Sequence, residues 1–122
     1  MIGGLIIAHE RLGESIIGAL DSISGTPKLI HAVSNNGMST SQLVEKIQAC
    51  TVKMPEGYVV FVDVYGGSCW RAAKMAVTAN FHIVTGVNLP MLLSFVNKRD
   101  KFSFEELPAI LEADGKRGVI AE

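Results

Sequence analysis

The sequence has no excess of either charge: 11 basic and 12 acidic side chains give a formal net charge of −1. Because no basic run exceeds two residues either, we expect no binding to nucleic acid. The chain also lacks an apolar run near the roughly 20 residues that a membrane helix needs. Its apolar start has no preceding basic segment and no cleavage site, so we expect no signal peptide.

Cysteine is scarce, and the two cysteines, Cys50 and Cys69, have no metal-binding or redox spacing. We therefore expect no metal site, and we interpret both as reduced thiols of a cytoplasmic protein. The sequence contains neither Gly-x-x-x-x-Gly-Lys-Ser/Thr nor Gly-x-Gly-x-x-Gly. Direct use of a nucleoside triphosphate therefore has no support, and we expect no cofactor.

What is present is an alternation of short apolar runs with stretches of helical periodicity. Hydrophobic residues make up 48% of the 122 residues and charged residues 19%, which is typical of a globular domain with a core. Strands are predicted at residues 1–8, 28–33, 58–64 and 81–87. The intervening helices are predicted to bury Leu12, Ile16, Ile17, Leu20 and Ile23; Leu43, Val44 and Ile47; Trp70, Ala73, Ala76 and Val77; and Met91, Leu92 and Phe95.

Two capping boxes mark helix starts, at Ser39–Gln42 and Ser103–Glu106, and Gly115 is predicted to close the last helix. Strands that alternate with helices predict an α/β protein with an open, mostly parallel, doubly wound sheet. We expect residues 1–122 to form a single domain with the flavodoxin-like strand order 2-1-3-4. Residues 119–121 are a possible antiparallel edge strand at the C-terminal end.

Two polar residues stand where apolar runs of predicted strands end: His9 after Ile2–Ala8 and Asp63 after Tyr58–Val62. In the order 2-1-3-4 these strands are neighbours whose helices leave to opposite faces, so both residues reach the expected ligand crevice. A carboxylate bonded to one imidazole nitrogen leaves the other nitrogen with a free lone pair. The pair is typical of a nucleophile or a general base.

Gly66, Gly67 and Ser68 follow Asp63 and open a predicted helix. Glycine lets backbone amides approach an anion, and a helix start adds unpaired amides and a positive dipole end. Together with His9, this arrangement suits phosphoryl transfer. Structural interpretations remain open: Asp63 as a cap, the glycines as a tight turn, and Ser68 as the helix N-cap.

Other notable residues have simpler interpretations. His31 and His82 lie in strands without an acidic neighbour and are interpreted as structural or surface residues. Trp70 on an apolar helix face is typical of a core residue, although it and Tyr65 are also candidates to flank the site. Residues 98–101, Lys-Arg-Asp-Lys, are interpreted as a solvated loop.

With these motifs in hand, the chain resembles the IIA domains of the mannose-type sugar phosphotransferase system. The resemblance rests on a strand ending in His9, on Phe61–Ser68 (Phe-Val-Asp-Val-Tyr-Gly-Gly-Ser), on Gly86–Leu92 (Gly-Val-Asn-Leu-Pro-Met-Leu), and on Gly115–Val119. It implies a cytoplasmic phosphotransferase that takes a phosphoryl group from the phosphocarrier protein HPr on a histidine and passes it to a separate IIB component. It also implies a homodimer, some members exchanging a C-terminal strand, and only indirect contact with the membrane through a IIC/IID permease.

By this resemblance His9 is the phosphorylated residue, Asp63 its orienting partner, and Ser68 a contact to the phosphate. The sequence departs from the family at Ala8, where a hydroxyl residue is frequent, and at Glu10, where glycine is usual. A carboxylate pointing inward at Glu10 would repel a phosphoryl dianion by about 1 kcal/mol at solvent-like screening. Two alternatives stay open: a phosphotransfer subunit for a dihydroxyacetone kinase, and a non-catalytic regulatory module of the same fold.

Overall fold

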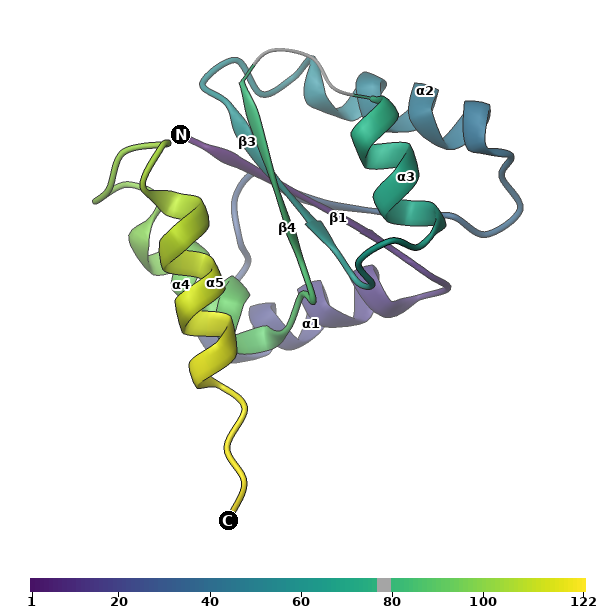
Figure 1. The fold of residues 1–122 in the computed structure, drawn as a ribbon. Coiled ribbons are helices and arrows are strands. Elements are labelled where there is room, and N and C mark those ends of the chain that lie inside the picture. Colours follow the sequence, from purple (N-terminus) through teal and green to yellow (C-terminus); the bar gives the residue numbers. More distant parts are fainter. Residues whose placement is uncertain (77–79) are drawn as a thin grey trace.

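The computed structural model describes residues 1–76 and 80–122, which alternate between strands and helices (Figure 1). No helix in these two ranges combines the length and the apolar character that a membrane crossing requires. Val77, predicted to be buried by the third helix, lies outside the described residues. The elements are β1 Gly3–Ala8, α1 Leu12–Ser24, β2 Ile30–Ser34, α2 Thr40–Thr51, β3 Tyr58–Val62, α3 Ser68–Met75, β4 Phe81–Thr85, α4 Leu89–Lys98 and α5 Leu107–Arg117.

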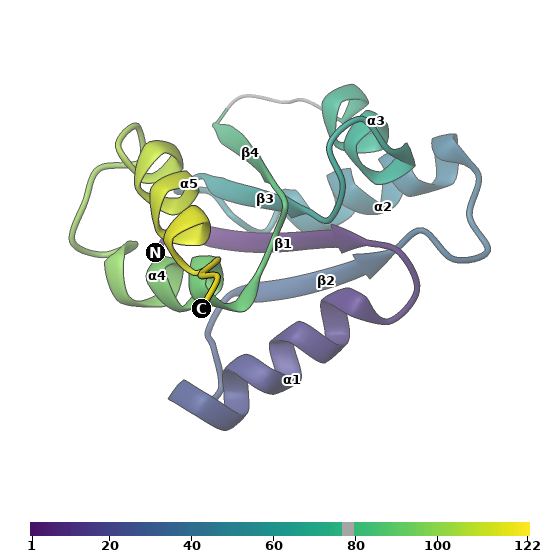
Figure 2. The ribbon, with the colours of Figure 1, turned by 60° about the horizontal axis from the view of Figure 1, so that its bottom comes forward.

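The four strands form one parallel sheet in the order β2-β1-β3-β4. Helices α2 and α3 cover one face, and α1, α4 and α5 cover the other (Figures 1 and 2). The predicted α/β class and strand order are therefore confirmed. Because β1 and β3 are neighbours whose following helices lie on opposite faces, the carboxyl ends of these strands form the predicted switch point.

The central strands are buried on both faces, so their sequences are apolar throughout rather than alternating. Leu5 and Val60 point toward α2 and α3. Ile6 and Phe61 belong to the cluster on the opposite face, where the Phe61 ring meets the edge of Phe95 with centroids 5.1 Å apart. The two hydrophobic clusters pack against opposite faces of β1 and β3. This packing fixes where the C-terminal ends of the two strands lie relative to each other.

The capping box of α2 is confirmed, because the Ser39 hydroxyl accepts the Gln42 amide at 3.2 Å and the Gln42 side chain accepts the Ser39 amide at 2.9 Å. The predicted apolar stripe of α1 is only partly buried. Leu20 is fully buried, whereas Leu12 and Ile23 are 43% and 59% exposed. The two exposed residues lie in the first and last turns of α1, so the ends of the stripe remain in solvent.

The C-terminal region differs from the prediction in three ways. Ser103 and Glu106 do bond to each other, but they shape a turn, and α5 begins only at Leu107. Gly115 does not end α5: it is buried within it, where a Cβ would approach the Met91 side chain at 2.7 Å. The glycine therefore allows close helix packing, while residues 118–122 form no strand and leave the body of the molecule (Figure 1).

The solvated loop predicted for residues 98–101 is wrong for its first two residues. Lys98 ends α4 and pairs with Asp114 at 2.7 Å. Arg99 is only 5% exposed, donates to the Ile2 carbonyl at 3.3 Å and lies over the Phe95 ring. A backbone acceptor at the start of the chain, distant in sequence, holds this cation inside.

Candidate functional site

Strand register brings the two polar strand-end residues together. Ile7 of β1 pairs with Val62 of β3, so Asp63 lies level with Ala8, one residue before His9. Past these strands the chain turns into α1 on one face and α3 on the other (Figure 1). His9 and Asp63 therefore meet in the crevice at the switch point, as the strand order predicts.

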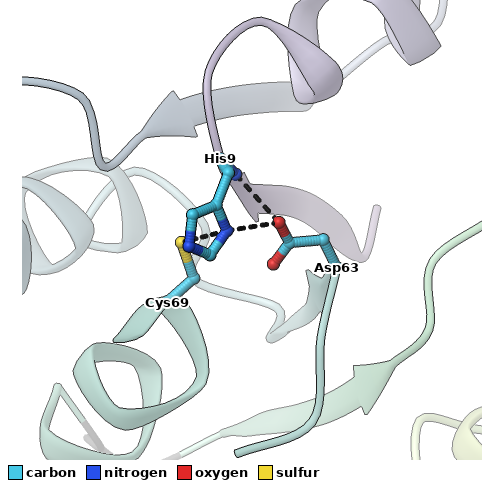
Figure 3. Close-up of side chains that lie close together, drawn as sticks. All are labelled: His9, Asp63 and Cys69. Carbon is cyan, nitrogen blue, oxygen red and sulfur yellow. Dashed lines mark hydrogen bonds and ion pairs between the residues drawn. The ribbon is translucent and has the colours of Figure 1, made fainter. Parts of the chain in front are cut away.

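His9 and Asp63 are joined by two hydrogen bonds (Figure 3). The Asp63 Oδ2 atom lies 2.6 Å from the His9 Nδ1 atom and accepts the His9 backbone N–H at 2.9 Å. Because a carboxylate only accepts, Nδ1 carries the hydrogen, and in the neutral ring Nε2 then keeps its lone pair. The imidazole is 46% exposed, so this lone pair belongs to an accessible ring that is fixed in orientation.

Asp63 is only 7% exposed and remains ionised. Burial alone raises the pKa of its carboxyl. The hydrogen bonds from His9 and Val64, and the charge of the His9 ring when it is protonated, outweigh burial, so the pKa is below the ordinary 3.8. Its second oxygen, Oδ1, accepts the Val64 amide at 2.9 Å. The aspartate thus holds its own loop and the end of β1 in one arrangement.

The Gly66-Gly67-Ser68 turn lies beside the imidazole. Gly66 has φ +81°, a left-handed conformation that favours glycine, and it turns the chain into α3. The N-cap prediction for Ser68 is wrong: Gly67 is the N-cap and provides no side chain, while Ser68 Oγ lies 3.4 Å from His9 Nε2. The first amides of α3 consequently lack a side-chain cap, which leaves donors for an anion next to Nε2.

Cys69 is a site neighbour that sequence reasoning missed. Its sulfur lies 3.8 Å from His9 Nδ1 in the first turn of α3, and its side chain is fully buried (Figure 3). Burial, with the negative charge of Asp63, raises the pKa of the thiol to about 11. The thiol is therefore protonated at neutral pH and is a poor nucleophile. The position of Cys69 directly after Ser68 was the available sequence signal for a site residue. Sequence position alone does not show whether the Cys69 side chain points toward His9.

Glu10 adopts φ +53°, a left-handed conformation that is unusual for a residue with a Cβ. The turn reverses the chain so that the Leu12 amide donates to the His9 carbonyl at 3.2 Å and α1 can begin. The glycine usual at this position in the resembled family has a physical explanation here, because glycine adopts this conformation without strain. Glu10 is exposed and makes no ion pair among residues 1–76 and 80–122.

The remaining candidates lie outside this crevice. Trp70 is half-buried rather than a core residue, and it packs against the exposed Tyr65 with centroids 5.0 Å apart. Both line a groove of about 940 Å³ that runs along β4 between α3 and α5. His31 is exposed on β2, and the His82 ring lies against Phe104 at a tilt of 37°, with centroids 4.2 Å apart.

Fold and geometry define an open, parallel α/β protein with an aspartate-bound histidine at its switch point. Comparison with known proteins then identifies the family. A model described as the PTS system fructose IIA component, EIIA-man, matches residues 3–112. The chain belongs to this family of IIA components of the sugar phosphotransferase system, as the sequence motifs predict.

Curated relatives support the assignment. The chain is 37% identical over 90 residues to the mannose-specific EIIAB components of the phosphotransferase systems of Escherichia coli K12 and Shigella flexneri. The match covers 70% of this chain and only 28% of those longer proteins.

Solved structures have the same fold. The phosphotransferase system component EIIA from Streptococcus agalactiae matches with a TM-score of 0.91 and 22% identity, over 99% of this chain and 97% of that one. The mannose/sorbose-specific IIA subunit from Enterococcus faecalis gives a TM-score of 0.87 and 23% identity, over 99% and 94%.

The ionised Asp63 predicts a specific dependence of stability on pH. Its folded-state pKa lies below that of the unfolded chain, so its contribution is present above pH 3.8 and is lost as the pH falls through the folded pKa. Asp63→Asn should lower the free energy of unfolding by about 1–3 kcal/mol at pH 7, and the gap should narrow below pH 3.8. Urea titrations at several pH values measure this difference in the free energy of unfolding between the wild type and Asp63→Asn. The exposed Asp100→Asn is the control, and an equal gap at pH 7 and pH 3 would contradict the assignment.

The left-handed Glu10 predicts a stabilising substitution. Glu10→Gly should raise the free energy of unfolding by roughly 0.5–1 kcal/mol, because relieved strain exceeds the entropy that glycine loses on folding. Glu10→Ala removes the charge but keeps the Cβ, so its stability should stay near that of the wild type. If alanine stabilises as much as glycine in chemical denaturation, the cause is charge and not backbone conformation.

Proposed function

We propose that this chain is a phosphocarrier that accepts a phosphoryl group from phospho-HPr on His9 and passes it to a separate IIB component. The single observation that carries the proposal is the His9–Asp63 pair, which leaves Nε2 with a lone pair beside the uncapped start of α3. An imidazole fixed in this way is a nucleophile, and the amides next to it suit the oxygens of a phosphoryl group.

In the proposed transfer, the Nε2 lone pair forms a bond to phosphorus while the bond from phosphorus to the donor atom of HPr breaks. The ring becomes positively charged, and Asp63 stabilises that charge through Nδ1–H without taking the proton. The Ser68 hydroxyl and the uncapped first backbone amides of α3 bind the phosphoryl oxygens. Transfer to IIB reverses these steps, so His9 returns to its neutral form.

The wider setting follows from family membership and is part of the proposal. The chain acts as one IIA domain in the cytoplasm, and the phosphoryl group reaches a sugar through IIB and a IIC/IID permease. The related longer proteins are mannose-specific EIIAB components, so a mannose-type system is the favoured context. No metal or cofactor enters the transfer itself.

We also propose a homodimer that involves the open edge of β4. This strand ends the sheet, and the groove beside it is lined by Phe81, Ile83 and other side chains of β4. Val119 and Ile120 are 79% and 74% exposed, and such neighbouring apolar residues are costly to leave in water. The C-terminal segment of the partner would pair as a strand with the edge of β4, and this pairing would bury Val119 and Ile120.

The phosphocarrier proposal is tested by incubating the protein with phosphoenolpyruvate, enzyme I and HPr and measuring its mass. We expect a gain of one phosphoryl group that His9→Ala abolishes, whereas His31→Ala, which alters another exposed histidine, retains it. Asp63→Asn should slow transfer on the order of a hundredfold or more, because the ring loses its orienting acceptor. No phosphorylation by the cognate HPr, or an Asp63→Asn protein as fast as the wild type, would overturn the mechanism.

The dimer is tested by multi-angle light scattering. We expect a mass of twice 13.1 kDa for the wild type and a shift to the monomer mass when Val119→Asp and Ile120→Asp are combined. Val52→Asp alters another exposed apolar residue, at the end of α2, and should leave the dimer intact. A 13.1 kDa wild-type species at working concentration contradicts the dimer.

A further inference from the structure

Three different kinds of metal-ligand atom meet beside His9. One His9 ring nitrogen, one Asp63 carboxylate oxygen and the Cys69 sulfur lie within 4.8 Å of one another. The three residues come from different parts of the fold: His9 follows β1, Asp63 follows β3 and Cys69 lies at the start of α3. Nitrogen, oxygen and sulfur together form the ligand set that zinc prefers. We infer that His9, Asp63 and Cys69 form a site for a borderline-soft divalent cation such as zinc, and that its occupancy blocks His9 as a phosphoryl acceptor.

Both distances from His9 Nδ1 are near those around a tetrahedral ion. Zinc bond lengths place neighbouring ligand atoms about 3.3–3.6 Å apart. The Cys69 sulfur is already 3.8 Å from His9 Nδ1. Asp63 Oδ2 is closer, at 2.6 Å, because it shares a hydrogen with Nδ1. Replacing this hydrogen by the cation requires the two atoms to separate by roughly 0.7 Å, which a side-chain rotation provides.

The charges around the cluster also favour a cation. Asp63 carries a negative charge, and no lysine or arginine among residues 1–76 and 80–122 pairs with it. Its ion-pair partner is His9, whose ring is 46% exposed and so reaches solvent. Three protein ligands leave the fourth tetrahedral position for water, whereas a closed structural zinc site has four protein ligands.

Occupancy and phosphorylation exclude each other for a chemical reason. A cation on Nδ1 uses the lone pair of that nitrogen, so the ring hydrogen moves to Nε2, and the Cys69 thiol releases its proton to solvent. Nε2 then bears a hydrogen and has no lone pair with which to attack phosphorus. This part of the inference rests on the proposed function of His9, whereas binding of the cation does not.

Binding is tested with cobalt(II), whose thiolate complexes absorb in the near ultraviolet, and with zinc by calorimetry. We expect a cobalt–thiolate band in the wild type, and one equivalent of zinc should displace it. Cys69→Ser should remove the band and weaken zinc binding by at least about tenfold. Cys50→Ser is the matched control, because the other cysteine lies on α2 outside the cluster, and it should behave as the wild type.

Circular dichroism establishes that Cys69→Ser folds, and Cys69→Ala serves if it does not. No band in excess cobalt, or a band that depends on Cys50 instead, would overturn the site.

The blocking effect is tested with isolated phospho-HPr, freed of enzyme I. Zinc should slow phosphorylation of the wild type by at least about tenfold and have little effect on Cys69→Ser. Equal inhibition of both proteins would overturn the blocking role. If metal-free wild type is not phosphorylated but binds cobalt, the phosphocarrier proposal fails and the metal site stands. If the metal-free wild type is phosphorylated but binds no cobalt, the metal site fails and the phosphocarrier proposal stands.

Discussion

The geometry of the site depends on the Asp63 carboxylate, which is nearly buried and accepts three hydrogen bonds. Two come from His9, through its backbone and its ring, and one comes from Val64. A buried charge is tolerated only when it is paired and fully bonded, so the carboxylate constrains everything around it. It joins the ends of two neighbouring strands, sets the tautomer of the imidazole, and provides the negative charge that both a phosphorylated ring and a metal ion would need.

Most of this arrangement could be predicted from the sequence, because it depends on periodicity and chain topology. The alternation of strands and helices predicts the parallel sheet, and two parallel neighbours with helices on opposite faces bring His9 and Asp63 to one crevice. Apolar runs report burial reliably when both faces of a strand are covered. The sequence-based prediction of the sheet and of the His9–Asp63 pair therefore holds where local patterns and overall topology indicate the same structure.

The parts that could not be predicted depend on the direction of single side chains and on contacts distant in sequence. Cys69 lies against the imidazole because the first turn of α3 points it inward, and its spacing contains no record of that direction. Arg99 is buried because a carbonyl near the start of the chain accepts its hydrogen bond. Gly115 resembles a helix end but serves close packing against Met91. In each case a partner from another element decides the outcome.

The exposed edge of His9 has a kinetic consequence. The exposed histidine ring, Ser68 and the start of α3 lie side by side, so on the proposed function a phosphoryl donor and a phosphoryl acceptor use the same surface. They compete for it rather than assemble around it. On the proposed function, transfer then proceeds by a ping-pong sequence in which each partner leaves before the next arrives. The flux through the chain is accordingly set by the ratio of the two partners as well as by their abundance.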